Sequence, residues 1–393
     1  MNWPEPGMHN GKSLIPFLQL RWLGRERIVA YSCILALVSL VSFYWTYRDA
    51  TGETGSDFLA FWSAGKLVVA GAASTVYDTA ATYAVQATLG RDEVFAFVNP
   101  PPFLLLVWPF GYLPFNLAWI LWIVATFTFW FVTSRRFVSG LSWPVLAFPG
   151  ALVGAWHAQT GLLTSGFQEA AANLLLRRPL VAGFCIGALI IKPHLAVLFP
   201  VALAAGKHWR AFGAAAVSVV ALFLVTWLAF GTDTILNYRQ SWPVSQYLMD
   251  TGDADFFLRQ VTIYAALRVV GPAWLATIAQ ALTTLAVAVL TWRVWSGKSR
   301  IEGKLAFLFA ATPLATPYLF SYDLPFLILP ICWLIGEARV RPGGAWERPM
   351  LLFFYLSPLV ARAAALPLGA NITPWVQVWM LWVIWRRLAS ASG

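Results

Sequence analysis

Long apolar runs, separated by short polar or basic segments, fill most of the 393-residue chain. Many of the runs approach 20 residues, the length that an α-helix needs to cross the roughly 30 Å hydrocarbon core of a bilayer. The runs that we expect to cross the membrane are 28–47, 100–133, 137–156, 162–176, 179–206 as two arms, 211–230, 273–295, 305–320, 324–336, 350–366 and 374–385. The pattern predicts an all-α polytopic membrane protein with about 12 transmembrane helices.

The composition supports a membrane protein. Hydrophobic residues make up 59% of the chain and charged residues 11%, which leaves too little polar surface to cover a soluble globule of this size. The net charge of +10 raises the possibility of nucleic-acid binding. However, the basic residues form short pairs between apolar runs rather than one patch, so we interpret them as topology signals and expect no nucleic-acid partner.

The basic pairs predict the orientation of the chain, because cytoplasmic loops of membrane proteins are enriched in Lys and Arg. Segment 1–27 and the tail 388–393 are therefore expected to be cytoplasmic, with one transmembrane domain over 28–387 between them. Two long polar loops, 48–99 and 231–272, belong on the extracytoplasmic side. The first of these loops is expected to carry surface helices, one of them over 77–89.

The crossing number of the run 100–133 is ambiguous, because prolines interrupt it before it ends at Arg135 and Arg136. One crossing puts this basic pair inside, whereas a tight hairpin puts it outside. The charges favour one crossing.

The run 179–206 has basic residues at both ends, so it must turn back in its middle. Lys192-Pro193-His194 occupies this middle, and a proline ends a helix because it lacks an amide donor. Each arm is about a dozen residues, or about 18 Å of helix. The turn at Lys192 is therefore expected within the outer half of the bilayer.

The stretch 57–66 follows the first span and begins with Asp57. Phe58, Phe61 and Trp62 recur at helical spacing, which predicts a helix lying flat on the bilayer surface with the carboxylate of Asp57 over a cavity. An Asp before such a stretch is also a common helix cap. Both interpretations of Asp57 stay open at this level.

This topology brings four polar clusters to the outer side. They are Asp57, His157 with Gln159, Lys192 with His194, and Tyr322 with Asp323. Because an ionisable group near hydrocarbon is costly, it usually faces a cavity and has a partner. Other roles are open: the lysine could extend to lipid headgroups, the histidines could be packing residues, and the Tyr-Asp pair could be an interfacial anchor.

Several kinds of chemistry have no support in the sequence. The three cysteines, Cys33, Cys185 and Cys332, lie within apolar runs and are interpreted as buried thiols. No metalloprotease, phosphate-loop or dinucleotide signature is present, so we expect no metal and no cofactor. The expected outer side carries an acid and several cations that could bind a phosphate leaving group. Nucleotide sugars are not expected on that side, so an activated group would have to arrive there on a lipid.

Five segments resemble glycosyltransferase family 87, bacterial enzymes related to polyprenyl-phosphate-mannose-dependent mannosyltransferases of the type C fold. The segments are Asp57-Phe58-Leu59-Ala60-Phe61-Trp62-Ser63-Ala64-Gly65 with Tyr77-Asp78, Asn99-Pro100-Pro101-Pro102-Phe103, Gln159-Thr160-Gly161-Leu162-Leu163-Thr164, Ile191-Lys192-Pro193-His194 and Thr316-Pro317-Tyr318-Leu319-Phe320-Ser321-Tyr322-Asp323-Leu324. The resemblance spans about residues 25–340. It implies an enzyme of the bacterial inner membrane with its active site on the extracytoplasmic side.

The resemblance also implies a reaction. A hexose, expected to be mannose, moves from a polyprenyl-phosphate-sugar donor to a lipid or glycan acceptor by a single inverting displacement. Asp57 acts as the general base and Lys192 with His194 binds the donor phosphate. Gln159, Tyr322, Asp323 and His157 are expected to orient the substrates.

Two other functions fit the residues. A multi-pass transporter or lipid flippase also has about a dozen helices with intramembrane Lys and Asp. The chain contains no internal repeat between its halves, and its outer loops are long, which argues against a carrier. A non-catalytic subunit of an envelope assembly is the third alternative.

Overall fold

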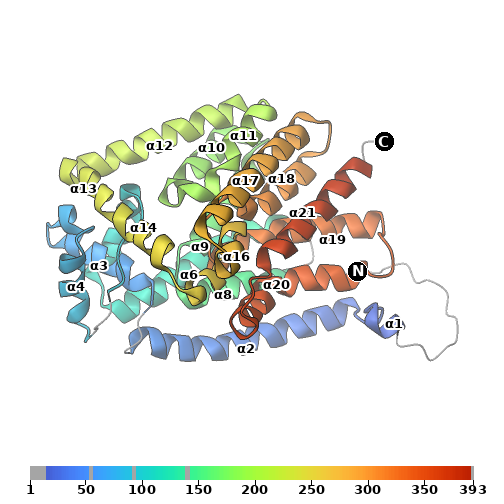
Figure 1. The fold of residues 1–393 in the computed structure, drawn as a ribbon, viewed down its shortest axis with the longest axis horizontal. Helices are drawn as coiled ribbons and strands as arrows, with labels where there is room; N and C mark the ends of the chain where they lie inside the picture. The colour runs from blue at the N-terminus through green and yellow to red at the C-terminus, as the bar shows by residue number, and fades with distance from the viewer. Residues whose placement is uncertain (1–14, 53–55, 91–93, 138–141, 391–393) are drawn as a thin grey trace.

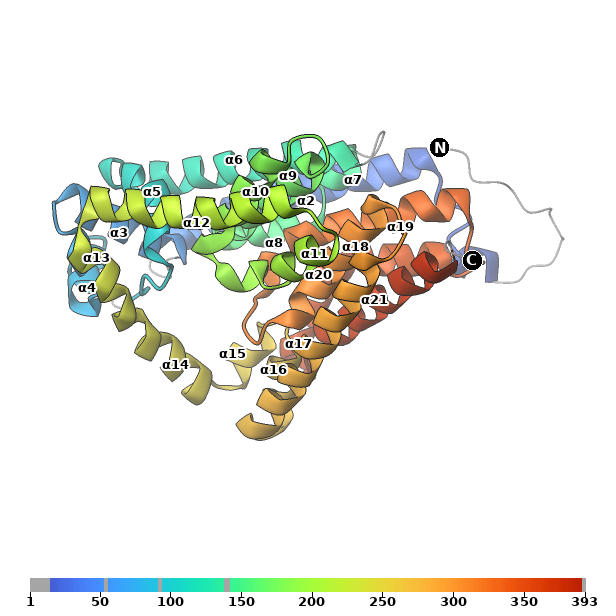
Figure 2. The ribbon, with the colours of Figure 1, turned by 90° about the horizontal axis from the view of Figure 1, so that it is seen from above.

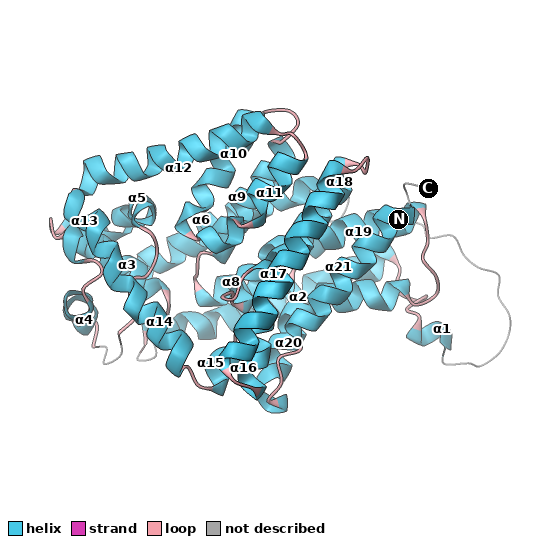
Figure 3. Ribbon diagram, turned by 45° about the horizontal axis from the view of Figure 1, so that its top comes forward, coloured by secondary structure: helices cyan, strands magenta, loops and turns pink. Residues whose placement is uncertain are grey.

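Helices form nearly all of the regular structure in the computed structural model, which describes residues 15–52, 56–90, 94–137 and 142–390 (Figure 1). All of the regular structure that Figure 3 draws is helical. Residues 1–14 of the expected N-terminal segment and 391–393 of the expected tail lie outside the described residues. The prediction of an all-α membrane protein is confirmed at this level.

Five of the described helices are long and apolar enough to cross a membrane. They are α2 (Arg25–Thr51), α6 (Phe115–Ser134), α12 (Trp209–Phe230), α17 (Ala273–Ser296) and α20 (Glu347–Leu368). A further long helix, α21 (Thr373–Ser390), completes the chain. These helices coincide with predicted runs. The expected count of about 12 crossings is not confirmed, because other runs are broken into shorter helices.

The broken runs form three hairpins of short helices. The hairpins are α8 (Pro149–His157) with α9 (Gly161–Leu174), α10 (Pro179–Ala188) with α11 (Leu198–Ala205), and α18 (Ile301–Ala311) with α19 (Ile328–Val340). Each helix has 8 to 14 residues. Most are therefore much shorter than the roughly 30 Å of hydrocarbon that a single span must cross. The tips of the hairpins consequently lie inside the helical bundle.

Shorter elements join these helices. The short α-helices are α1 (Ile15–Leu18), α5 (Leu104–Val107) and α7 (Ser142–Leu146). The 3₁₀ turns are η1 (Ala73–Thr75), η2 (Pro101–Phe103), η3 (Trp108–Tyr112), η4 (Arg135–Phe137), η5 (Leu189–Ile191), η6 (Pro193–Ala196), η7 (Tyr238–Gln240), η8 (Thr312–Ala315) and η9 (Ser321–Leu327). Four of these turns, η2, η3, η6 and η8, have a proline as their first or second residue, which interrupts the helical hydrogen-bond ladder.

The two long polar loops fold into helices. The first contains α3 (Phe58–Val69) and α4 (Thr79–Ala87), and the second contains α13 (Thr232–Asn237), α14 (Ser241–Thr251), α15 (Ala254–Leu258) and α16 (Ile263–Val270). In Figure 2, α14 runs as a separate arm from α13 to α15 at the edge of the bundle. The helix predicted over 77–89 matches α4.

The prediction that the stretch 57–66 lies flat on the bilayer surface is wrong. Nearly all of α3 is buried, including Phe58 and Trp62. The segment 101–112, which hydropathy assigns to a span, instead folds into short helices that cover α3. Gly65 permits this contact, since a Cβ there would lie 2.7 Å from the carbonyl oxygen of Val107. The stretch is therefore an internal support of the site.

The ambiguous run 100–133 contains one helix of spanning length, α6 with its extension to Phe137. The first dozen residues of the run do not cross the membrane, because they form the short helices that cover α3. One crossing of this region agrees with the interpretation that the charges favoured.

Different helices lie at the two ends of the bundle. Figure 2 places α1 and the end of α21 together at one end, and α3, α4 and α13 at the opposite end. One continuous core joins both, with buried residues from Ala50 to Leu388.

Candidate active site

The candidate active site forms where the tips of the three hairpins meet. Both α8 and α9 pack on η9, and η5 packs on α9. The closest approach is at Gly161, where a Cβ would lie 2.0 Å from the carbonyl oxygen of Tyr322. Only glycine fits this contact, so the Gln-Thr-Gly motif has a steric role. Three of the four predicted clusters therefore lie side by side.

Lys192 occupies the break between η5 and η6. Its backbone is outside the helical region, with φ −149° and ψ 71°, in keeping with the steric bias of a residue before proline against the helical conformation. The side-chain amide of Asn99 donates to the carbonyl oxygen of Ile191 at 3.2 Å, so it satisfies an acceptor that the break leaves without a helical partner. This bond gives the Asn-Pro-Pro-Pro motif a structural role in holding the lysine turn.

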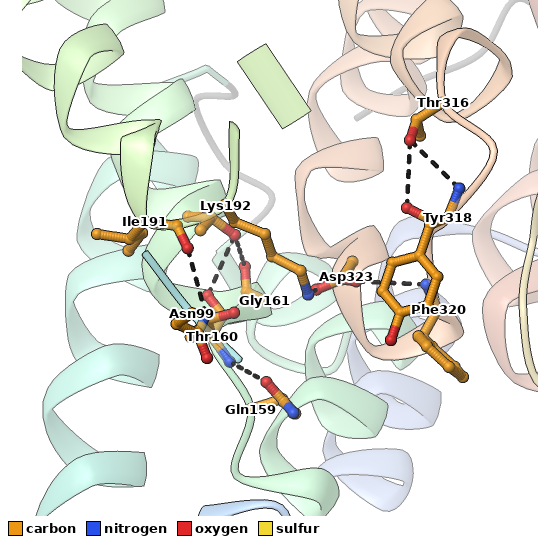
Figure 4. A network of polar contacts seen from close by, with 11 residues as sticks. Asn99, Gln159, Thr160, Gly161, Ile191, Lys192, Thr316, Tyr318, Phe320 and Asp323 are labelled. Atoms are coloured by element: carbon orange, nitrogen blue, oxygen red, sulfur yellow. Dashed lines mark hydrogen bonds and ion pairs between the residues drawn. The ribbon is translucent and has the colours of Figure 1, made fainter. Parts of the chain in front are cut away.

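Lys192 and Asp323 form a buried ion pair. The Nζ atom lies 2.5 Å from Oδ1 of Asp323, and the exposed fractions of the two residues are 8% and 0%. Figure 4 shows the lysine side chain extending from its turn to the carboxylate. Oδ2 of Asp323 accepts a bond from the backbone amide of Phe320 at 3.3 Å. The sequence did not predict that these two candidates pair with each other.

Aromatic rings surround the ion pair. Nζ of Lys192 lies 5.1 Å from the ring centroid of Tyr322, within the range of a cation–π contact. The Phe320 ring stacks on Tyr322 at 5.1 Å, and the Tyr318 ring contacts Phe320 at 5.3 Å. This wall of rings makes the surroundings of the ion pair apolar, and a low local dielectric strengthens electrostatic interactions.

The two predicted histidines face this wall. The ring of His157 lies 5.2 Å from that of Tyr322, and the ring of His194 lies 6.0 Å from that of Tyr318. Nε2 of His194 is buried without a hydrogen-bond partner among the described residues. His157 ends α8, and Ala158 then adopts a left-handed conformation that turns the chain.

Gln159 follows this turn, and its Oε1 accepts a bond from the backbone amide of Thr160 at 3.1 Å. Its amide group lies among the labelled side chains of Figure 4. Gln159 therefore sits at the edge of the same cluster, with its amide nitrogen free of any hydrogen bond to the described residues.

Asp57 is the N-cap residue of α3, yet its side chain accepts no capping hydrogen bond. It forms no ion pair with a described residue either. Its electrostatic neighbours are His157, Tyr318, Tyr322 and Asp323. The helix-cap interpretation is therefore wrong, and the fourth predicted cluster joins the other three with an unpaired carboxylate.

Burial sets the protonation of the groups at the hairpin tips. It lowers the pKa of His157, against the opposing effect of Asp57. It raises the pKa of the Tyr322 hydroxyl well above its ordinary value. It also raises the pKa of Asp323, although Lys192 acts in the opposite direction. Near neutral pH, His157 is thus an uncharged imidazole and Tyr322 a neutral hydrogen-bond donor.

Two arginines near the site were missed by the sequence analysis. Arg259 and Arg362 both interact electrostatically with His157. The signal for Arg362 was available, because an arginine inside an apolar run is a functional candidate by default. Arg259 lies among mixed charges in the second long polar loop, where no local pattern distinguishes it.

The described residues contain no group of three His, Cys, Asp or Glu side chains arranged to hold a metal ion. The chemistry that these residues support is proton acceptance by Asp57 beside a cationic, aromatic-lined region.

Comparison with known proteins identifies a family. The model of glycosyltransferase family 87 matches residues 97–317, more than half of the chain. The matched range contains Gln159 and Lys192, whereas Asp57 precedes it by 40 residues and Asp323 follows it by six. No curated protein and no solved structure matches the chain.

Proposed function

Because the chain belongs to glycosyltransferase family 87, we propose that it transfers a hexose, expected to be mannose, from a polyprenyl-phosphate-sugar donor to an extracytoplasmic lipid or glycan acceptor. The family and the apolar helices make it a membrane glycosyltransferase. The donor, the sugar and the acceptor are the proposed parts. One transmembrane domain over 28–387 would carry the activity, in a bacterial inner membrane with both termini cytoplasmic.

The observation that carries this proposal is the unpaired carboxylate of Asp57 beside the ion pair of Lys192 and Asp323. A general base must be ionised and must have a lone pair that no other protein group occupies. Asp57 has no capping bond and no ion pair among the described residues. A transporter would not require an unpaired acid next to a buried cation and this wall of aromatic rings.

The proposed reaction is a single displacement. Asp57 accepts the proton of the acceptor hydroxyl, whose oxygen forms a bond to the anomeric carbon. The bond from that carbon to the donor phosphate oxygen breaks, and its electron pair stays on the phosphate. Lys192 and His194 bind this phosphate and stabilise its developing charge in a site that excludes water. The polyprenyl tail stays among the apolar helices.

The remaining candidates orient the substrates. In this proposal, Tyr322 and Gln159 hydrogen-bond sugar hydroxyls, and His157 contacts the acceptor near Asp57. Asp323 acts on the lysine, since their ion pair fixes the position of the ammonium group. Such fixed groups lower the barrier because they need no rearrangement when charge develops.

The test is sugar transfer by the purified protein, with labelled polyprenyl-phosphate-mannose as the donor and a membrane lipid extract as the acceptor source. We expect Asp57→Asn to lower the rate by about 100-fold or more, the usual effect of removing a general base. Asp78→Asn is a matched control. The side chain of Asp78 caps α4 by accepting hydrogen bonds from the backbone amides of Ala80 and Ala81, and an asparagine oxygen can accept the same bonds.

Two results would contradict the proposal. Unchanged transfer by Asp57→Asn would remove Asp57 from the mechanism. A wild-type protein that consumes no donor but moves labelled lipid across vesicle membranes would instead be a flippase.

A further inference from the structure

A groove of about 860 Å³ opens at the end of the bundle that carries the last turn of α21. Its walls come from the ends of α17, α19 and α21 and from the start of α18. Helix α18 packs on each of the other three, so the groove lies where four helix ends meet. None of the residues that line it belongs to the candidate active site, and the proposed reaction uses none of them.

Basic side chains predominate among the charged residues of this groove. Two acidic residues and five basic residues line it, which leaves an excess of three positive charges among the described lining residues. The acidic residues are Glu302 and Glu337, and the basic residues are Arg293, Lys298, Arg300, Arg341 and Arg387. Basic residues at helix ends are also common topology signals, so their charge alone does not indicate a ligand. The pairing and the surroundings of these residues distinguish this groove.

Both acids of the groove already have a basic partner. Oε2 of Glu302 lies 3.6 Å from Nε of Arg300, and Oε2 of Glu337 lies 2.5 Å from Nη2 of Arg341. Arg387 forms its own ion pair with an acid of the loop after α19. The negative charges at the groove are therefore used by three of its five cations.

The other two cations, Arg293 and Lys298, have no such partner. Neither forms an ion pair or a side-chain hydrogen bond with any described residue, and both are exposed. Two like charges that line one groove without a counter-charge repel each other. An anion bound in the groove would relieve this repulsion.

The loop between α17 and α18, which carries Lys298, is held by hydrogen bonds. Nζ of Lys304 donates to the carbonyl oxygens of Trp295 and Gly297, each at 2.8 Å. Nε1 of Trp295 in turn donates to the carbonyl oxygen of Lys304 at 3.1 Å. Lys298 directly follows Gly297, so its backbone starts from a fixed point.

The loop after α19 is held from the opposite wall of the groove. The guanidinium group of Arg387 donates to the carbonyl oxygen of Arg341 and pairs with Glu347. The backbone amide of Gly343 donates to Oε2 of Glu347 at 2.7 Å. Both walls are therefore formed before a ligand binds, which reduces the entropy lost on binding.

Exposed apolar side chains lie beside these cations. Val340 is 78% exposed and Trp385 is 47% exposed, and both line the groove. Trp292, the neighbour of Arg293 in α17, is 51% exposed. Tryptophan beside basic residues is typical of the depth at which lipid headgroups meet hydrocarbon. A soluble anion would gain nothing from this apolar surface, whereas a phospholipid presents a phosphate together with acyl chains.

A second groove continues the apolar surface. It has a volume of about 990 Å³, shares Arg341 and Arg387 with the first groove, and lies between α20 and α21. Phe353, Trp379 and Trp382 are among the residues that line it. Acyl chains that leave the first groove past Arg341 would therefore meet aromatic side chains.

We propose that the groove between α17, α18, α19 and α21 binds an anionic phospholipid of the surrounding membrane. Arg293 and Lys298 bind the headgroup phosphate through charge-assisted hydrogen bonds to its oxygens. The acyl chains lie along Trp385 and the second groove. Basic pockets between membrane helices suit anionic headgroups in this way. The binding of this lipid does not depend on the proposed reaction.

The position of the groove connects it to the candidate site. Helices α18 and α19 are the arms of the hairpin whose tip, η9, carries Asp323. The groove lies at the open end of this hairpin, between the first turn of α18 and the last turn of α19. A lipid bound there joins the two arms, so it is expected to stabilise the folded protein.

The first experiment measures lipid binding by native mass spectrometry in neutral detergent, with phosphatidylglycerol and phosphatidylcholine as probes. Wild-type protein is expected to bind phosphatidylglycerol about tenfold more tightly, and the double variant Arg293→Gln/Lys298→Gln to lose that preference. Arg135→Gln/Arg136→Gln is the matched control, since it removes two exposed cations that line neither groove. The proposal is wrong if wild type shows no preference, if the groove variant keeps it, or if the control loses it equally.

The second experiment separates a membrane lipid from a soluble anion through the melting temperature in the same detergent. Phosphatidylglycerol should raise the melting temperature of wild type by about 3 °C and leave that of the groove variant unchanged. Glycerol 3-phosphate, a phosphate ester without acyl chains, should cause no shift at the same concentration. An equal shift with glycerol 3-phosphate would make the groove a site for soluble anions and overturn the proposal. Equal shifts of wild type and groove variant with the lipid would place the lipid elsewhere and also overturn it.

Discussion

Asp57 and Lys192, the two charged residues central to the proposed reaction, have different surroundings. The carboxylate of Asp57 is unpaired among the described residues, whereas the ammonium group of Lys192 is paired with Asp323 and nearly buried. A base needs a free lone pair, and a cation that must stay in one place benefits from a partner. Each residue therefore has the surroundings that its proposed role requires.

The ion pair of Lys192 and Asp323 is expected to stabilise the fold. Lys192→Met leaves a buried carboxylate without its partner, which we expect to cost about 3 kcal/mol. Asp323→Asn should have a similar cost, and the double variant should lose less than the sum of the two. The check is the melting temperature of each variant in detergent. Arg300→Gln, which breaks an exposed pair with Glu302 at 3.6 Å, should change it little. Equal effects of the buried and exposed changes would contradict this expectation.

His157 is expected to make stability depend on pH. Because its pKa is lowered in the folded state, the unfolded chain binds more protons once the pH falls below about 6.5. Stability should therefore be complete above this pH and decrease as the pH falls toward the folded pKa. Melting temperatures between pH 7.5 and 5 should show a steeper decrease for wild type than for His157→Gln. Parallel curves would remove His157 as the cause.

At the scale of the elements, three hairpins of short helices build the site, and close backbone contacts hold them together. Breaks in these hairpins coincide with Pro193 and Pro317 and with the left-handed Ala158. Each break frees backbone groups and places polar side chains inside a mainly apolar bundle. This arrangement allows a reactive centre without a soluble domain.

The contact between α9 and η9 is expected to be intolerant of a single methyl group. In Gly161→Ala, the new Cβ would lie 2.0 Å from the carbonyl oxygen of Tyr322, so η9 must shift and carry Asp323 with it. We expect a loss of sugar transfer of about 100-fold, as for other small misplacements of reactive groups. The measurement is transfer rate together with melting temperature.

Gly213→Ala is the control for this change, because no atom lies within 4 Å of a Cβ at Gly213 in α12. Alanine favours a helix over glycine, so this variant should be as stable as wild type or more so. A similar loss of activity in both variants would show that the Gly161 contact is not the reason.

At the scale of the whole molecule, the bundle has two distinct ends. The candidate site and the helices of both long loops lie away from the end that carries α1 and the last turn of α21 (Figure 2). The basic loops that follow α17 and α19 belong to the predicted cytoplasmic side. The lipid substrates can therefore reach the site from the outer leaflet in the proposed orientation.

This orientation predicts which loops react with a membrane-impermeant maleimide. In a variant without Cys33, Cys185 and Cys332, a cysteine at Asp250 should be labelled in intact cells, since α14 is exposed in the outer loop. A cysteine at Ser299, in the basic loop after α17, should be labelled only after lysis. The opposite pattern would invert the topology.

The sequence by itself determined the class of the protein, its family and the break at Lys192-Pro193. Apolar runs identify membrane helices because the bilayer imposes a length, and Pro193 ends a helix through its own missing amide. Ordered motifs identified the family, which the family model confirms. These properties are local, or depend on composition and order alone.

Only the tertiary structure decided how the charges are paired and what covers the site. Lys192 and Asp323 lie 131 residues apart, and α15 packs on α20 from a distant part of the chain. The burial of α3 depends on Gly65 fitting against a distant segment. No local pattern encodes such contacts, because they arise when several helices pack at once and each side chain takes the partner that this packing brings within reach.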